Sequence, residues 1–101
     1  MPALAICTVD TINTGHPCDG TATIQGALQS KVTVGGNPVA VVGDAITSHN
    51  RLVGDSCVPH SAFILGGSSK VSISGIAVAR VGDAADLGTI ISGSSKITVG
   101  A

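Results

Sequence analysis

The sequence contains almost no aromatic residues and little charge. Its 101 residues include one Phe, no Tyr and no Trp, and 11% are charged, against about 25% in an average soluble domain. The chain therefore offers neither a platform for stacking bases nor an aromatic-lined pocket for a small-molecule substrate. Five Lys and Arg stand against six Asp and Glu, which gives a formal charge of −1. Without a basic excess to neutralise phosphates, nucleic acid is not an expected partner.

Long apolar runs are missing as well. No stretch approaches the ~18 residues of a membrane span, and residues 1–7 have no basic start and too short an apolar stretch for a signal peptide. The length fits one domain, which we place over residues 1–101. A domain this small commonly needs a disulfide, a metal or a partner as a staple. Three Cys is an odd number for a disulfide framework, whereas three Cys with three His favour a metal site.

The sequence does contain many short β-type segments, and these repeat. β-branched residues alternate with others in segments bounded by Gly, Asn or Pro, which is typical of strands and turns. Residues 31–44 match residues 70–83 at an offset of 39 without a gap, and residues 96–101 begin a third copy. The sequence therefore predicts an all-β fold built from three equivalent units.

The third copy is split between the two chain ends. Joining Ala101 to Met1 continues it through residues 1–8 in the same register, with no residue inserted or lost. In that register Cys7 and Thr8 stand where the other copies have Gly and Asp. We therefore predict a closed, pseudo-threefold body of β-hairpins in which the termini meet to complete the third repeat, which anchors both ends and leaves few free sheet edges.

The turn residues of the repeat have a structural interpretation. Asp44 and Asp83 each follow a Gly at the end of a copy. We interpret the Gly as supplying an unusual φ and the Asp as capping the turn through backbone amides, so neither is assigned a catalytic role. Cys7 replaces one of these turn residues and is interpreted as a small buried hydrophobic residue.

The His residues and two of the three Cys lie in the two longer segments between repeats. Pseudo-threefold symmetry brings these segments together at one end of the body. Zn²⁺ favours four N and S ligands, whereas Ca²⁺ and Mg²⁺ prefer oxygen ligands. The predicted structural zinc site, with Fe less favoured, is His16, His49, Cys57 and His60. Cys18 is the competing thiolate, and a Cys18–Cys57 disulfide is the alternative use of the two sulfurs.

The third, shorter segment provides no ligand in this interpretation. An Ile-x-Gly pattern marks the end of each segment, at Ile24, Ile64 and Ile91. Counting back four residues from this pattern places Leu87 opposite His60. Leu cannot bind a metal, so the four ligands are expected from the first two segments alone.

Three segments share a short pattern: Pro-Ala-Leu-Ala at residues 2–5, Pro-Val-Ala-Val at residues 38–41 and Ala-Val-Ala-Arg at residues 77–80. In these segments the sequence resembles the PAAR-repeat proteins, and the resemblance covers essentially the whole chain. It implies a small cone of β-hairpins that caps and sharpens the trimeric β-helical spike of a contractile injection apparatus, either a phage tail or a type VI secretion system. It also implies a zinc ion near the apex, held by the three His with Cys57. Many members place a Cys in the third segment, where Leu87 stands here.

The resemblance also defines the expected partner and location. One copy is expected to bind per spike trimer, through its base, and to contact the target membrane only transiently while helping to pierce the envelope. The location is then the tip of a phage tail, or the bacterial cytoplasm before delivery. The chain stops at its last strand, so a bare tip is expected. The alternative function is a free-standing, metal-stabilised β module for binding or decoration; an enzyme is disfavoured because four protein ligands close a metal site.

Overall fold

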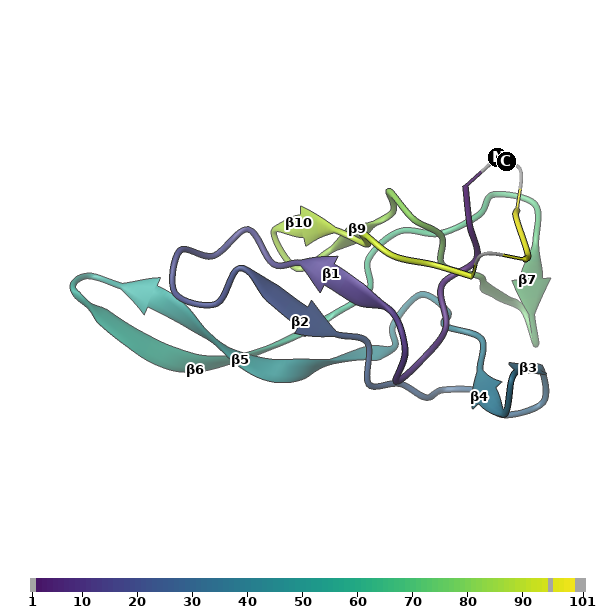
Figure 1. The fold of residues 1–101 in the computed structure, drawn as a ribbon, viewed down its shortest axis with the longest axis horizontal. Helices are drawn as coiled ribbons and strands as arrows, with labels where there is room; N and C mark the ends of the chain where they lie inside the picture. The colour runs from purple at the N-terminus through teal and green to yellow at the C-terminus, as the bar shows by residue number, and fades with distance from the viewer. Residues whose placement is uncertain (1, 95, 100–101) are drawn as a thin grey trace.

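The computed structural model describes residues 2–94 and 96–99. This part of the chain consists of short strands and turns, without a helix, in an elongated body with extents of 41 × 23 × 23 Å (Figure 1). The strands are β1 (Thr11–Asn13), β2 (Thr21–Thr23), β3 (Thr33–Val34), β4 (Asn37–Pro38), β5 (Ala45–Val53), β6 (Ser56–Phe63), β7 (Ser72–Ile73), β8 (Ile76–Ala77), β9 (Ala84–Ala85) and β10 (Gly88–Thr89). Consecutive strands pair as antiparallel hairpins. No helix long and apolar enough to span a membrane is found among the described residues.

A ring of backbone hydrogen bonds closes the body around a pseudo-threefold axis. The amide of Ala5 donates to the carbonyl of Ala79, Ala79 donates to Ala40, and Ala40 donates to Ala5, at 2.9–3.0 Å. All three alanines are fully buried. Each repeat thus donates to one neighbour and accepts from the other, which confirms the predicted closed, all-β arrangement with three repeats. The first and last described segments also pair, through a bridge between Ala3 and Thr98; the predicted join of Ala101 to Met1 lies outside the described residues.

The register of the third repeat differs by one residue from the prediction. The amide of Val39 donates to the carbonyl of Val32, seven positions earlier, and the repeat over residues 70–83 has the same bond. Leu4 makes the equivalent bond with Ile97, which is eight positions back when counted through the chain ends. Because a one-residue slip would turn each side chain to the opposite face of the strand, burial of Leu4 selects this register.

The turn of the first repeat changes accordingly. Thr8 has a φ of 63° and occupies the place of Gly43 and Gly82, both with a φ of 93°. The amides of these three residues donate to the carbonyls of three equivalent isoleucines, Ile24, Ile64 and Ile90. The prediction that Cys7 and Thr8 take the places of Gly and Asp is therefore wrong by one position.

The capping carboxylate of the first repeat is Asp10. Its Oδ2 accepts from the amide of Ile6 at 2.7 Å, as Asp44 accepts from Val41 at 2.8 Å and Asp83 from the amide of Arg80 at 2.7 Å. The capping role expected for Asp44 and Asp83 is therefore confirmed. Asp10 lies one position further along because its turn contains an extra residue.

Two hydrophobic clusters fill the body along its length. The base cluster lies at the wide end and contains Leu4, Ile6, Val39, Val41, Val78 and Val99. The central cluster lies towards the narrow end and is made of small residues and isoleucines, including Ile12, Ile24, Ile46, Ile64 and Ile90. Cys7 also belongs to it and is 1% exposed, as expected for a small buried residue. Burial and the neighbouring Asp44 carboxylate raise the pKa of Cys7 to about 12, so it remains a neutral thiol.

Candidate metal centre at the narrow end

Three segments of the chain meet beyond the central cluster. The β5–β6 hairpin extends past the other hairpins towards the narrow end (Figure 1) and carries His49 and His60, which are directly paired across its two strands. The loop between β1 and β2 contributes His16, and the turn between β9 and β10 contributes Asp86. A register shift in β5 between Ile46 and His49 allows the strand to bury Ile46 in the core and also turn His49 inward.

The three imidazoles surround the carboxylate of Asp86. The Nε2 atoms of His16 and His49 lie 2.8 and 2.7 Å from Oδ2 of Asp86, and Nε2 of His60 lies 3.1 Å from Oδ1. One potential ligand atom from each of the four residues lies within 4.8 Å of the others. The side chains of His16, His49 and Asp86 are 6%, 3% and 5% exposed, whereas that of His60 is 22% exposed. The cluster is therefore compact and almost closed to solvent.

The second ring nitrogen of His49 fixes its tautomer. Nδ1 lies 2.8 Å from the carbonyl oxygen of Thr47, which only accepts, so Nδ1 carries the proton. In the neutral ring, Nε2 then presents a lone pair towards the carboxylate of Asp86 at 2.7 Å. Two acceptors facing each other repel unless a proton or a cation lies between them. A backbone carbonyl that holds Nδ1–H while Nε2 faces inward is the usual second contact of a metal-binding His.

Asp86 supplies the negative charge of the cluster. Burial by itself raises the pKa of this carboxyl, but the facing imidazole rings of His49, His60 and His16 lower it by more, so the pKa lies below the ordinary value. Asp86 is consequently ionised at neutral pH. One carboxylate and three imidazoles form a donor set suited to a divalent transition metal.

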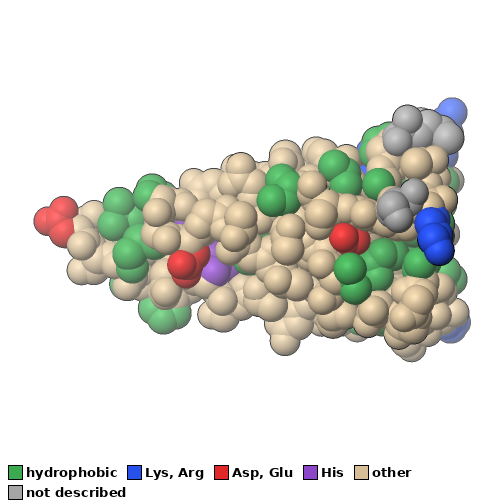
Figure 2. Space-filling view, in the orientation of Figure 1, with side chains coloured by type: hydrophobic (Ala, Val, Ile, Leu, Met, Phe, Trp, Pro, Cys, Tyr) green, Lys and Arg blue, Asp and Glu red, His purple; other side chains and the backbone are tan. Residues whose placement is uncertain are grey.

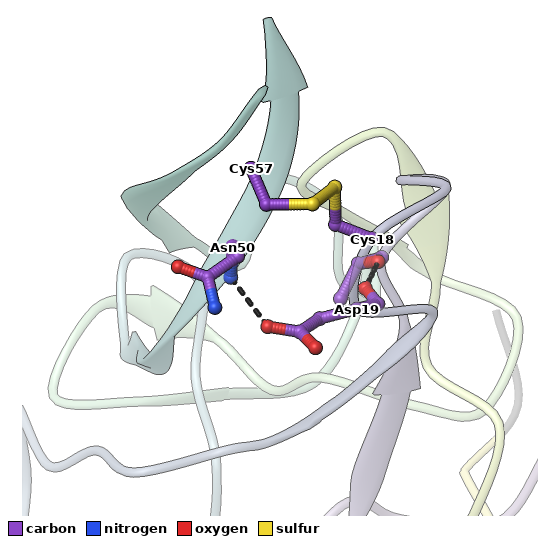
Figure 3. Close-up of a disulfide and its surroundings, with 5 residues drawn as sticks. Cys18, Asp19, Asn50 and Cys57 are labelled. Carbon is purple, nitrogen blue, oxygen red and sulfur yellow. Dashed lines mark hydrogen bonds between the residues drawn. A yellow bond between two sulfur atoms is a disulfide. The ribbon is translucent and has the colours of Figure 1, made fainter. Parts of the chain in front are cut away.

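Cys57 lies apart from this cluster. It forms a disulfide with Cys18, with the two Cα atoms 6.0 Å apart (Figure 3), and a sulfur in a disulfide is no thiolate ligand. The reason is the alternation of side chains along a strand: Cys57 and His60 are three positions apart on β6, so they point to opposite faces. The structure thus brings together three of the four predicted ligands, His16, His49 and His60, and adds Asp86. Of the two uses considered for the sulfurs, it contains the disulfide.

A hydrogen bond supports the disulfide. Oδ2 of Asp19 accepts from the amide of Asn50 at 2.6 Å (Figure 3), and the hydroxyl of Thr14 donates to the carbonyl of Asp19. The loop between β1 and β2 is therefore joined to the β5–β6 hairpin at Cys18 and at the adjacent Asp19. These contacts place His16 of the loop opposite His49 of the hairpin.

The Ile-x-Gly pattern does not point to Asp86, because it aligns the third segment with the other two one residue out of register. The buried isoleucine equivalent to Ile24 and Ile64 is Ile90, at 1% exposure, whereas Ile91 is 48% exposed. Counting back four positions from Ile90 gives Asp86, the equivalent of His60 before Ile64. Leu87, the residue predicted for that place, is 75% exposed. When the three segments are aligned on their buried isoleucines, Ile24, Ile64 and Ile90, Asp86 takes the position of His60.

The comparison with known families agrees with this architecture. A sequence profile described as the PAAR motif matches residues 11–89. The chain therefore belongs to the PAAR motif family, whose members act at the spike tip of contractile injection systems, associate with a spike protein and bind metal in general. The family role is structural. The sequences of characterised proteins contain no match to the chain.

Proposed function

We propose that this protein caps and sharpens the trimeric β-helical central spike of a contractile injection apparatus, in a phage tail or a type VI secretion system. The observation that carries the proposal is the closed hydrogen-bond ring of Ala5, Ala40 and Ala79. This ring gives a single chain a base with threefold pseudosymmetry. Such a base can cover a true trimer as one copy, while the rest of the chain tapers to a point. Residues 1–101 act as one domain, without a catalytic role, and contact the target membrane only in passing.

The base has an apolar surface that supports this docking. An open hollow at the wide end is lined almost entirely by aliphatic side chains, among them Val32, Val71, Ile73 and Ile97. Val32, Val71 and Ile97 are 44%, 44% and 36% exposed, although they lie beside the base cluster. A contiguous exposed apolar face indicates an interaction site. The blunt end of a β-helix presents unpaired strand edges and apolar side chains, which such a face would cover.

The narrow end is proposed to hold one structural divalent metal, with zinc favoured over iron. The residues that would hold it are His16, His49, His60 and Asp86, in place of the set with Cys57. A bound cation would remove the repulsion between Nε2 of His49 and the Asp86 carboxylate and would join three segments of the chain. Because the segments depend on each other for this site, the free energy of metal binding adds to that of folding.

A charged substitution in the apolar hollow of the base is expected to abolish binding to the spike. Val71→Asp places a charge in the apolar hollow, and a buried, unpaired carboxylate costs several kcal/mol, on the order of 3 or more. We expect co-elution with a purified trimeric β-helical spike protein to be lost in size-exclusion chromatography. Leu65→Asp is the matched control, because Leu65 is 63% exposed and does not line the hollow. If the wild-type protein folds but binds no such trimer, the free-standing β module replaces the spike tip as the function.

The assignment of Asp86 is tested by two substitutions. Asp86→Asn removes the negative charge while keeping the shape, and we expect zinc affinity to fall by at least about tenfold, since loss of even an indirect partner of a metal ligand has that effect. Asp86→Cys restores a charged ligand and is expected to keep about one zinc per chain. Competition titration against a coloured chelator measures both. Asp55→Asn, which removes an exposed carboxylate outside the cluster, is the control, and equal affinity in Asp86→Asn and wild type would contradict the assignment.

A further inference from the structure

Three lysines surround the apolar hollow at equivalent positions of the three repeats. Lys31, Lys70 and Lys96 directly precede Val32, Val71 and Ile97, which line the hollow. The hydrogen bonds from Val39, Val78 and Leu4 to the carbonyls of those three lining residues establish the equivalence. All three lysines are exposed. They form the lysine rim of the base, one cation for each third of the surface.

The backbone of the lysine rim is held by polar side chains. The Ser68 hydroxyl oxygen accepts from the amides of Lys70 and Val71 at 3.2 and 2.9 Å, and that of Ser94 accepts from Lys96 at 3.1 Å. In the remaining repeat, Oε1 of Gln29 accepts from the amide of Val32 at 2.9 Å. In each repeat, the Ser or Gln two positions before the lysine holds the backbone at or directly after that lysine. The backbone of the rim is therefore part of the ordered base.

The charges of the rim have no counter-ion among the described residues. The ion pairs there join three His to Asp86, and Arg80 to Asp83. Asp10 and Asp44 accept backbone amides within the body, while the exposed Asp55 lies in the turn of the β5–β6 hairpin at the other end. On the face shown in Figure 2, the basic side chains gather at the wide end and an acidic group occupies the extreme of the narrow end.

We propose that the partner face carries one carboxylate from each of three identical subunits, positioned to meet Lys31, Lys70 and Lys96. This inference rests on the proposed function and adds the chemistry of the partner. A homotrimer repeats any acidic side chain three times around its axis, and the rim repeats a cation three times around the pseudo-threefold axis. The apolar hollow supplies the buried contact, and the rim supplies the encounter rate and rotational register, because charges at the edge of an interface act mainly on those.

The test is the binding of a purified trimeric β-helical spike protein from the same source. The variant carries Lys31→Glu, Lys70→Glu and Lys96→Glu, and the association rate is measured at about 50 and 500 mM salt, since screening weakens exposed charge pairs. We expect the wild-type rate to fall at least tenfold at high salt. At low salt, the variant should associate at least a hundredfold more slowly than wild type, and its dependence on salt should reverse. Each single substitution should have a similar, smaller effect. Arg51→Glu, the same charge change in the exposed part of β5, should leave the rate unchanged.

The outcomes separate this inference from the proposed function. If the wild-type chain binds the trimer and the triple variant binds at the same rate with the same salt dependence, the acidic partner face is wrong and the spike-tip function stands. If one lysine accounts for the whole effect, the threefold match is likewise overturned. If the folded wild-type chain binds no trimer at either salt concentration, the proposed function fails, and the inference fails with it.

Discussion

Removing the metal is expected to lower the melting temperature by at least about 15 °C. A ligand present at a thousand times its dissociation constant stabilises the folded state by about 4 kcal/mol, and in a domain of this size each kcal/mol shifts the melting temperature by about 4–8 °C. His49→Ala should abolish this zinc-dependent gain, because His49 is the most deeply buried of the three imidazoles. Thermal unfolding followed by circular dichroism, with zinc and with a chelator, measures both effects.

A control at the same end of the molecule separates metal binding from general charge effects. Asp55→Asn removes an exposed carboxylate that is not part of the cluster, so its zinc-dependent gain should equal that of wild type. A protein that contains zinc by elemental analysis, yet melts at the same temperature after complete chelation, would contradict the structural role of the metal.

Chelation should loosen the narrow end more than the rest of the body. The ring amides of Ala5, Ala40 and Ala79 are buried in the body and bonded to carbonyls of the same ring, so after chelation they should still exchange more slowly than the amides of the narrow end. The amides of residues 14–20 and 47–60 belong to segments that the metal would join, and their exchange should accelerate. Uniform acceleration along the chain would instead mean that the metal stabilises the whole domain as one cooperative unit.

The internal repeat predicts the fold, but it does not predict the register in which the two ends of the chain meet. The match of residues 31–44 with residues 70–83 is continuous, so it gives both the β character and the symmetry. The third copy crosses the termini, where no bond constrains the spacing, and the structure accommodates one additional position between Ile97 and Leu4 there. Only burial and the hydrogen-bond ring establish that difference.

The sequence predicts the three His of the site, but neither the carboxylate of Asp86 nor the place of Cys57. All three His lie in the two longer segments between repeats, which indicates a metal site, whereas a carboxylate such as Asp86 is one of six acidic residues and is distinguished only by its position. Cys57 and His60 are separated by two residues, a spacing that lets both side chains reach one ion from a tight turn. On a strand the same spacing points the two side chains apart, and that outcome depends on the pairing of β5 with β6.

Removing the disulfide is the second change expected to lower the stability of the protein strongly. Cys18 and Cys57 are 39 positions apart, and closing a loop of that length in the unfolded chain is worth up to about 4 kcal/mol in the chain-entropy model. We expect the double substitution Cys18→Ser and Cys57→Ser to lower the free energy of unfolding by about 2–4 kcal/mol, as measured by urea denaturation without reductant. Reductant should destabilise the wild-type protein by a similar amount and leave the double variant unchanged.

The same variant separates the two roles of sulfur at the narrow end. If His16, His49, His60 and Asp86 hold the metal, the double variant keeps about one zinc per chain, although it is less stable. The native protein should then show no rapidly reacting thiol, because Cys7 is 1% exposed and its raised pKa keeps it protonated; unfolding without reductant should reveal a single thiol. Loss of zinc in Cys57→Ser, with three thiols in the unfolded wild-type protein, would instead make Cys57 a ligand. Two staples of different chemistry therefore give opposite responses to chelator and to reductant, and each can be removed while the other still joins the loop between β1 and β2 to the β5–β6 hairpin.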